Sequence, residues 1–298
     1  MTLLLVVAAL LLDQFLGEPK RWHPLVGFGR LADSIERLLN RGGYRYLKGI
    51  LALLLAVMPL AWLAHWLSQQ FGLVVDLLLL YLAIGAKSLV QHLKQVIMVL
   101  QQGTLEQART QVGMIVSRDA SGMDRTAVIR AALESLLENG LDALFGALFW
   151  FVVAGPVGVV VYRLVNTLDA MWGYRTERFQ QFGWAAARFD DLLNWVPARL
   201  TAFSYALMGN YCCARRCWRQ QSAELASPNG GVVMTAGAGS LGITLGGDAV
   251  YHGERVAKPL FGAGRAPEVG DLYRAQDLFH KSLLLWLAVM GVGGIFLV

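Results

Sequence analysis

The sequence predicts an all-α, polytopic integral membrane protein with about four spans, a re-entrant or kinked hairpin and helical cytoplasmic segments. Composition is the first observation behind this prediction. Hydrophobic residues make up 56% of the 298 residues and charged residues only 16%, whereas soluble domains carry about 25% charged residues. The mean hydropathy is +0.48. The second observation is a set of uncharged runs long enough to enter a bilayer.

Four spans are expected in chain order, near residues 1–17, 49–67, 71–90 and 282–298. The first lacks the basic start and the cleavage site of a signal peptide, so it is expected to stay as an anchor. Between the first two spans, residues 18–48 hold seven Lys/Arg against three Asp/Glu. The positive-inside rule therefore places this segment in the cytoplasm.

The hairpin is expected at residues 143–165. It carries Ala154-Gly155-Pro156-Val157-Gly158 at its middle, and glycine next to proline breaks a helix. Two arms of roughly ten residues would enter the membrane and return on the same side, which is tolerated where they pack in protein. The polar segments 91–142 and 166–281 would then both be cytoplasmic. A single kinked crossing is the alternative.

Acidic residues precede the hairpin at a helical spacing. Glu134, Glu138 and Asp142 follow i, i+4, i+8 and share one helix face. Acids beside a membrane segment are costly unless solvated, paired or bound to metal, and Mg²⁺ is bound by one or two carboxylates plus substrate phosphates. Asp190 and Asp191 form a second acidic group. For both groups, ordinary solvated or ion-paired helix faces are the alternative.

Three other patterns are weaker. Ser227 is expected to cap a helix that starts at Pro228, where free amides could hold a phosphate. The segment 237–242 matches G-x-G-x-x-G but lacks the strand and acid of a dinucleotide site, so close helix packing is expected. The net charge of +5 suits an anionic lipid or substrate. No basic tract with interleaved aromatics predicts nucleic-acid binding.

Motifs along nearly the whole chain resemble the adenosylcobinamide-phosphate synthase family of cobalamin biosynthesis. They combine acids, amides and glycines in a fixed order, and together they are highly specific. The matching pieces are Asp13 with 17–19 and 23–24, residues 117–121, 134–142, 162–174, 187–199, 227–229, and 245–247 with Tyr251 and 253–254.

The resemblance implies an ATP-dependent, amide-forming enzyme. Its acid substrate would be an adenosylated corrinoid, adenosylcobyric acid, and its amine (R)-1-amino-2-propanol or the O-phosphate. The product would be adenosylcobinamide or its phosphate. ATP and Mg²⁺ are the implied co-substrate and metal. The implied location is the bacterial inner membrane, with the active site facing the cytoplasm. Homo-oligomers and complexes with other enzymes of the pathway are compatible with the sequence.

Carried onto matched positions, the resemblance implies three groups of site residues. The catalytic group comprises Glu134, Glu138, Asp142, Asn166 and Asp169. The metal ligands are Glu138, Asp142, Asp190 and Asp191. The residues expected to hold cofactor or substrate are Asp13, His23, Arg118, Asp119, Trp172, Tyr174, Arg188, Arg199, Ser227 and Asn229. Among the last group, Trp172 is expected to dock the apolar face of the corrinoid.

Two other classes of function stay open. One is a membrane signalling or sensor protein from a distant branch of the same superfamily, which we expect to lack these dense polar motifs. The other is a small transporter with a broken helix at its binding site. A transporter of that type would not consume ATP when given corrinoid and amine.

Overall fold

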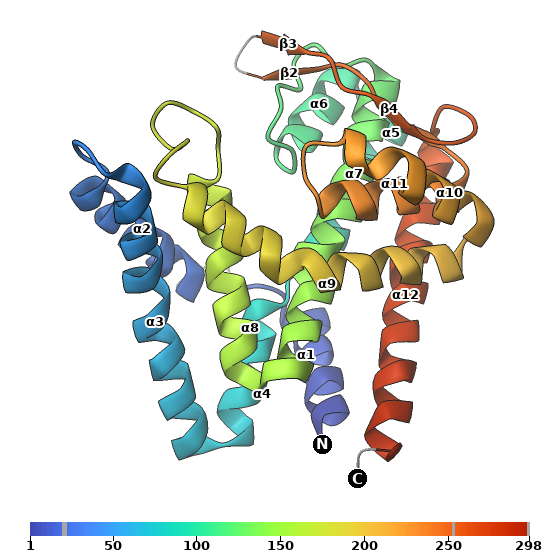
Figure 1. Ribbon diagram of the computed structural model, residues 1–298. Coiled ribbons are helices and arrows are strands. Elements are labelled where there is room, and N and C mark those ends of the chain that lie inside the picture. Colours follow the sequence, from blue (N-terminus) through green and yellow to red (C-terminus); the bar gives the residue numbers. More distant parts are fainter. Residues whose placement is uncertain (20–22, 252–253, 297–298) are drawn as a thin grey trace. The chain divides into compact units, whose positions relative to one another are not determined.

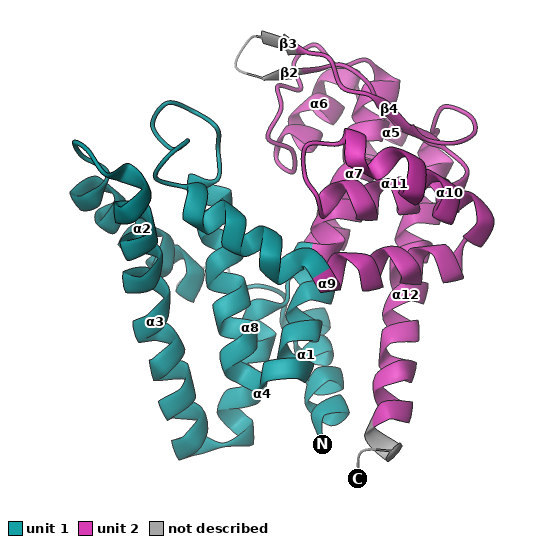
Figure 2. Cartoon of the chain, viewed as in Figure 1, with its two compact units in different colours: residues 1–86, 142–195 teal, residues 87–141, 196–298 magenta. Residues whose placement is uncertain are grey.

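The computed structural model describes residues 1–19, 23–251 and 254–296, and it is predominantly helical (Figure 1). This confirms the expected all-α, polytopic class. The chain divides into two compact units (Figure 2): unit 1 holds residues 1–86 and 142–195, and unit 2 holds residues 87–141 and 196–298. Residues 20–22 of the expected segment 18–48, motif residue Gly253 and the last two residues of the expected span 282–298 lie outside the described residues.

Unit 1 is built largely from apolar helices. They are α1 (Thr2–Leu16), α2 (Pro24–Leu39), α3 (Arg45–Phe71), α4 (Leu73–Ala83), α8 (Gly146–Trp172) and the first half of α9 (Trp184–Met208). A π-helical turn at Leu141–Phe145 precedes α8. Helix α8 packs against α2, α3 and α4, and α1 packs against α4. The expected span 71–90 is interrupted after α4. There the Gly85 N–H makes no helical hydrogen bond and donates instead to the Ala143 carbonyl at 2.9 Å.

Unit 2 surrounds α7. Its helices are α5 (Ala86–Gln102), α6 (Leu105–Gly113), α7 (Arg125–Gly140), α10 (Tyr211–Gln221), the 3₁₀ turn Ser222–Glu224, α11 (Gly230–Leu241), α12 (Val269–Phe296) and the second half of α9. Two short antiparallel pairs join β1 (Thr244–Gly246) to β4 (Leu260–Gly262) and β2 (Ala249–Tyr251) to β3 (Glu254–Val256). Helix α7 packs against α6, α11, α12 and β1.

Helix α3 has the side-chain distribution of a membrane span. Its buried positions are mostly small, including Gly49, Ala52, Ala56 and Ala64, while bulky residues such as Trp62 (68% exposed) point outward. Small residues at helix contacts and large apolar residues facing outward are typical of helices in lipid. Within the described residues, three helical stretches are long and apolar enough to cross a membrane: Arg45–Phe71, Leu73–Gln102 and Arg125–Trp172.

The hairpin expected at residues 143–165 folds back at Gly155. This residue has φ 63° and ψ −155°, a conformation that glycine adopts readily. A Cβ on Gly146 would lie 2.1 Å from the Tyr162 hydroxyl, and Arg163 Nη1 donates to the Asp142 carbonyl at 3.3 Å, across 21 positions. A straight helix would separate those two residues by about 30 Å. The break therefore returns the chain to its starting level, and the side of the membrane on which it does so stays a prediction.

Helix α11 explains the glycine-rich segment 237–242. A Cβ on Gly237 would lie 2.5 Å from the Leu137 side chain, and one on Gly239 would lie 2.8 Å from the Ala214 backbone. The motif thus serves close helix packing, as expected. The predicted helix start is two residues too early, because α11 begins at Gly230 with Asn229 at the cap position. Ser227 still provides a hydrogen-bond acceptor for the first turn of α11, since its Oγ accepts from the Gly230 N–H at 2.9 Å.

Candidate functional site

Unit 1 contains a group of hydrogen-bonded polar side chains between the ends of the hairpin and α9. We call it the polar cluster; its members are Asp142, Tyr162, Arg163, Asn166, Asp190 and Asn194. Asp142 lies in the π-helical turn, a local geometry that is frequent at functional sites. The fold-back at Gly155 supplies Tyr162, Arg163 and Asn166 to the same place.

Asn194 is the centre of the polar cluster. It is only 2% exposed. Its Nδ2 donates to Asp190 Oδ2 at 3.0 Å and to Asp142 Oδ1 at 3.5 Å, and its Oδ1 accepts from the Tyr162 hydroxyl at 3.0 Å. One amide group therefore holds two carboxylates close together, and one or two carboxylates are what the protein usually contributes to a magnesium site.

The side-chain amide of Asn166 links the Asp190 carboxylate to the Arg163 guanidinium. Asn166 Nδ2 donates to Asp190 Oδ1 at 3.4 Å, while Asn166 Oδ1 accepts from Arg163 Nη1 at 3.4 Å. Burial raises the pKa of the Asp190 carboxyl to about 6, although the hydrogen bonds from Asn194 and Asn166 favour its ionised form. Asp190 is thus poised to change charge close to neutral pH or to be held ionised by a bound cation.

Asp191 and Arg188 form an ordinary helix-surface pair. Arg188 Nη1 donates to Asp191 Oδ2 at 2.9 Å, three residues along α9, and the Arg188 side chain is half exposed. Burial raises the pKa of Asp191, opposed by Arg188 and Arg175. The alternative of simple ion pairing therefore accounts for the Arg188–Asp191 contact, and the expected roles of the two residues in phosphate and metal binding stay predictions.

Two aromatic residues near the end of α8 have opposite surroundings. Trp172 is 1% exposed and packs edge-on against Phe182, with ring centroids 5.1 Å apart. Its ring offers no face to a corrinoid, so the docking role expected for Trp172 is wrong; as a large apolar group it is buried in the core of unit 1. Tyr174 is half exposed and is accessible to a ligand. Asp169 lies nearby, with its Oδ1 2.1 Å from where a Cβ on Gly173 would be.

Asp13 and His23 lie at other places in unit 1. Asp13 is buried in α1 at 2% exposure. His23 caps α2, where its Nδ1 accepts from the Leu25 N–H at 3.2 Å. Burial lowers the pKa of His23; the Glu18 charge opposes this effect and the Arg163 charge adds to it. The imidazole is therefore near the polar cluster and uncharged at neutral pH.

Unit 2 contains a cavity of about 600 Å³ with both acidic and basic residues in its wall. We call it the charged cavity. Its ionisable lining residues are Arg118, Glu134, Glu138, Glu224 and Lys258. A cavity of this size is within the range of small-molecule sites, roughly 300–1,000 Å³.

Glu134 is fixed at one wall of the charged cavity. It forms a short ion pair with Arg118, and both side chains are about one-tenth exposed. Its other oxygen, Oε1, accepts from the Gly246 N–H of β1 at 2.8 Å. The carboxylate is thus saturated by a buried cation and a backbone donor, and it positions Arg118 and β1 at the cavity.

Glu138 lies one helical turn further along α7. Its Oε1 is 2.2 Å from where a Cβ on Gly230 would be, so the carboxylate lies beside the first turn of α11 and the Ser227 hydroxyl. Lys258 and Arg118 are the cations that attract it electrostatically, and Glu134 repels it. The Glu138 carboxylate, the cations Arg118 and Lys258 and the Ser227 hydroxyl therefore line one cavity.

The remaining expected residues of unit 2 are placed apart from these contacts. Arg199 Nη1 donates to the buried Asn229 Oδ1 at 3.2 Å, which joins two of the predicted residues. Asp119 is exposed, and its Oδ1 accepts from the Ser121 N–H at 2.8 Å. That backbone hydrogen bond lowers the pKa of Asp119. The contact is turn chemistry, as the short motif alone would suggest.

The structure therefore distributes the expected catalytic residues over both units. Glu134 and Glu138 lie in unit 2, while Asp142, Asn166 and Asp169 lie in unit 1. Within the part of the chain that is described, no three His, Cys, Asp or Glu side chains converge into a metal site. A bound magnesium ion would therefore take most of its ligands from substrate oxygens and water.

Sequence reasoning omitted four residues from its site: Tyr162, Arg163, Asn194 and Lys258. Asn194 follows Asp190 at i+4, so helical spacing signalled its contact with the acid. Tyr162 and Arg163 lie in the motif at residues 162–174, and the fold-back at Gly155 could have assigned them to the site. No pattern in the sequence pointed to Lys258.

Comparisons with known proteins give one consistent result. Residues 6–279 match the family model described as CobD/Cbib protein. The chain is 55% identical to a cobalamin biosynthesis protein CobD from Stutzerimonas stutzeri, over 97% of both chains. It is 51% identical to a protein of the same description from Chromobacterium violaceum, over 94% of this chain and 93% of the relative.

A more distant relative also matches most of the chain. A cobalamin biosynthesis protein CobD from Mycobacterium tuberculosis is 38% identical, over 92% of this chain and 90% of its own. No solved structure matches the chain.

Proposed function

The chain belongs to the CobD/Cbib family of cobalamin biosynthesis, and on that premise we propose that it is an ATP-dependent acid–amine ligase. It joins (R)-1-amino-2-propanol, or its O-phosphate, to the propionate carboxylate of adenosylcobyric acid. The observation that supports this proposal is the charged cavity, where Arg118, Lys258 and the start of α11 surround Glu138.

The chemistry requires an activated carboxylate. A propionate oxygen attacks the terminal phosphorus of ATP, forms an acyl phosphate and releases ADP. The amine then attacks the acyl carbon, loses a proton and expels inorganic phosphate. Positive charge must lie where the phosphate charge develops, and Lys258 and Arg118 are the cations that line the charged cavity. Arg118 is held in place for this purpose by Glu134.

A base is needed for the ammonium form of the amine. Glu138 in unit 2 and Asp169 in unit 1 are the two candidates, and each can be tested by an amide replacement that keeps its shape. A carboxylate within hydrogen-bond distance of the amine would accept the proton as the C–N bond forms.

The polar cluster supplies the groups that fit magnesium. Asp142 and Asp190 accept from the same amide nitrogen, and oxygen ligands of this kind suit the ion. When bound, magnesium would supply positive charge at the polar cluster. Asn194 holds the Asp142 and Asp190 carboxylates close together, and Asn166 links Asp190 to Arg163.

We place the enzyme in the bacterial inner membrane with its site facing the cytoplasm. The three apolar helical stretches support a membrane location. An Asn166→Cys variant tests the orientation after the native residues Cys212, Cys213 and Cys217 are replaced by alanine. A membrane-impermeant thiol reagent should label position 166 from the cytoplasmic side. Labelling from the periplasm alone would contradict the proposed topology.

The activity is tested on membranes that contain the overproduced chain. Given ATP, adenosylcobyric acid and either amine, they should form the amide product and release ADP in equal amounts, and omission of any substrate should stop both. Corrinoid movement across vesicles without ATP use would favour a transporter. If the membranes bind the corrinoid but neither form the amide product nor transport the corrinoid, the result would favour a sensor.

A further inference from the structure

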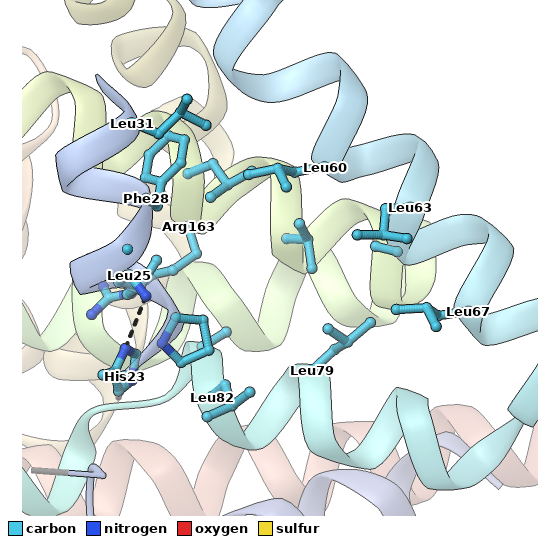
Figure 3. A pocket seen from close by; sticks show the side chains of 16 residues that line it. His23, Leu25, Phe28, Leu31, Leu60, Leu63, Leu67, Leu79, Leu82 and Arg163 are labelled. Atoms are coloured by element: carbon cyan, nitrogen blue, oxygen red, sulfur yellow. Dashed lines mark hydrogen bonds between the residues drawn. The ribbon is translucent and has the colours of Figure 1, made fainter. Parts of the chain in front are cut away.

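A second cavity, of about 360 Å³, lies in unit 1 among α2, α3, α4 and α8 (Figure 3). We call it the apolar cavity. Leu60, Leu63 and Leu67 lie along one wall on α3, and Leu79 and Leu82 lie on α4. Seven residues along α3 correspond to roughly 10 Å. The space is therefore elongated and lined by aliphatic side chains, which suits a flexible hydrocarbon chain.

The apolar cavity reaches the outer surface of unit 1. Leu31 and Leu63, both in its wall, are each about two-fifths exposed. On α3 the neighbouring Leu55, Met58 and Trp62 are also exposed. Since α3 is long and apolar enough to cross a membrane, these side chains are expected to contact lipid, and the cavity opens on the same apolar surface.

One end of the apolar cavity is polar. His23 and Arg163 lie away from Leu67 in Figure 3, and they are the ionisable residues of the lining. Arg163 remains positively charged, whereas burial lowers the pKa of His23. Glu18 is the acid that influences this histidine, and it is not part of the wall. The lining therefore carries a net positive charge at the end of an aliphatic slot.

We propose that the apolar cavity binds one acyl chain of an anionic membrane phospholipid, whose phosphate lies near Arg163 and His23. Hydrocarbon in the slot matches its leucine walls, and the phosphate matches the guanidinium. Arg163 also holds Asn166 and the Asp142 carbonyl. The lipid would thus contact the residue that joins the hairpin ends in the polar cluster.

Lipid retention by the purified full chain tests this proposal. Native mass spectrometry from detergent micelles is carried out with phosphatidylglycerol and with phosphatidylcholine of the same chains. One phosphatidylglycerol should stay bound at least about tenfold more strongly than phosphatidylcholine. Glycerol phosphate without a chain should not compete. Equal retention of the two lipids, or competition by glycerol phosphate, would overturn the assignment.

Variants separate the cavity from the general lipid surface. Ala83→Phe and Leu60→Trp each fill the apolar cavity, and each should weaken phosphatidylglycerol binding about tenfold or more. Leu55→Phe adds similar bulk to the lipid-facing side of α3 and should change binding less than twofold. Thermal unfolding confirms that each variant is folded. If both cavity variants bind like Leu55→Phe, the cavity is not the lipid site.

The headgroup contact has its own variant. Arg163→Gln keeps the chain slot and removes the positive charge. Its phosphatidylglycerol affinity should fall to that for phosphatidylcholine. A retained preference for phosphatidylglycerol would show that the phosphate lies elsewhere.

Discussion

The polar cluster of unit 1 and the charged cavity of unit 2 hold their acids in different ways. In unit 1, Asp142 and Asp190 accept hydrogen bonds from the neutral amides of Asn194 and Asn166. In unit 2, Glu134 is neutralised by Arg118 and by a backbone N–H. Neutral donors leave the negative charge of a carboxylate available to a cation, whereas an ion pair cancels it.

This difference separates acids that can bind from acids that stabilise. Asp190 is suited to attract a positive group, while Glu134 is already committed to its partner. Glu138 is intermediate between these two cases. Lys258 and Arg118 attract it electrostatically, but the described contacts include no ion pair to Glu138.

Removing Glu134 should have the largest effect on stability. Glu134→Ala leaves Arg118 with an uncompensated charge at about one-tenth exposure, which costs roughly 3–5 kcal/mol of unfolding free energy. Glu106→Ala is the matched control, because its pair with Arg109 is on the surface with Glu106 83% exposed. Denaturation in detergent measures both. Similar, small losses for the two variants would mean that the Glu134 pair is not structural.

Neutralising Glu138 should remove activity without unfolding the chain. Glu138→Gln keeps the shape beside Gly230, and loss of a contact made in the transition state costs about 2–4 kcal/mol, or roughly 30- to 1000-fold in rate. Asp142→Asn should act similarly from unit 1. Turnover per folded molecule measures the effect, with Glu106→Gln as the control. Unchanged turnover in both site variants would mark the acids as solvated helix faces.

Neutralising Asp190 should stabilise the metal-free protein at neutral pH. The pKa of Asp190 is raised from 3.8 to about 6, so its ionisation disfavours the folded state as the pH rises from about 4 through 6. At about 1.4 kcal/mol per pKa unit the cost approaches 3 kcal/mol. The Asp190→Asn substitution removes this cost but also loses a hydrogen bond worth about 1 kcal/mol. The net gain in unfolding free energy is therefore about 2 kcal/mol.

The gain should be visible at pH 8 and absent at pH 4, where Asp190 is largely protonated. Thermal unfolding in a chelating buffer at the two pH values measures it. Glu106→Gln is the control, because this carboxylate belongs to a surface pair and is 83% exposed. A gain that is equal at both pH values would show that charge is not its cause.

Arg188→Ala should have the smallest effect on stability. An exposed pair three residues apart contributes about 0.3–0.5 kcal/mol. If Arg188 clamps a phosphate as the family resemblance implies, KM for ATP should rise about tenfold while stability is unchanged. Unaltered KM would leave Arg188 with its surface pair alone.

The sequence predicted the elements whose signals are local. Apolar runs predicted α1 and α3, and Gly155-Pro156 predicted the fold-back, because helix length and helix breaking depend on neighbours in the chain. Asp190 and Asn194 are likewise four residues apart, a spacing at which helical side chains meet, and they form a hydrogen bond.

Contacts over long sequence distances were not predictable in this way. Glu134 accepts from Gly246 across 112 positions, and no periodicity encodes such a pair. Trp172 shows the opposite error, since its place inside a polar motif suggested a ligand contact while its packing on Phe182 buries it. Composition cannot distinguish an aromatic ring that faces a ligand from one that faces the core.

The fold-back at Gly155 also has a consequence for how unit 1 responds to bilayers of different thickness. Helix α3 has 27 residues, about 40 Å, which exceeds the roughly 30 Å hydrocarbon core, so it tilts when that core becomes thinner. The hairpin has both ends at one level, joined by Arg163 and Asp142. If it is re-entrant, as the sequence predicts, its tip meets no second interface. Hydrophobic mismatch would then be absorbed by α3, and the spacing of the hairpin's polar residues would stay the same in thin and thick membranes.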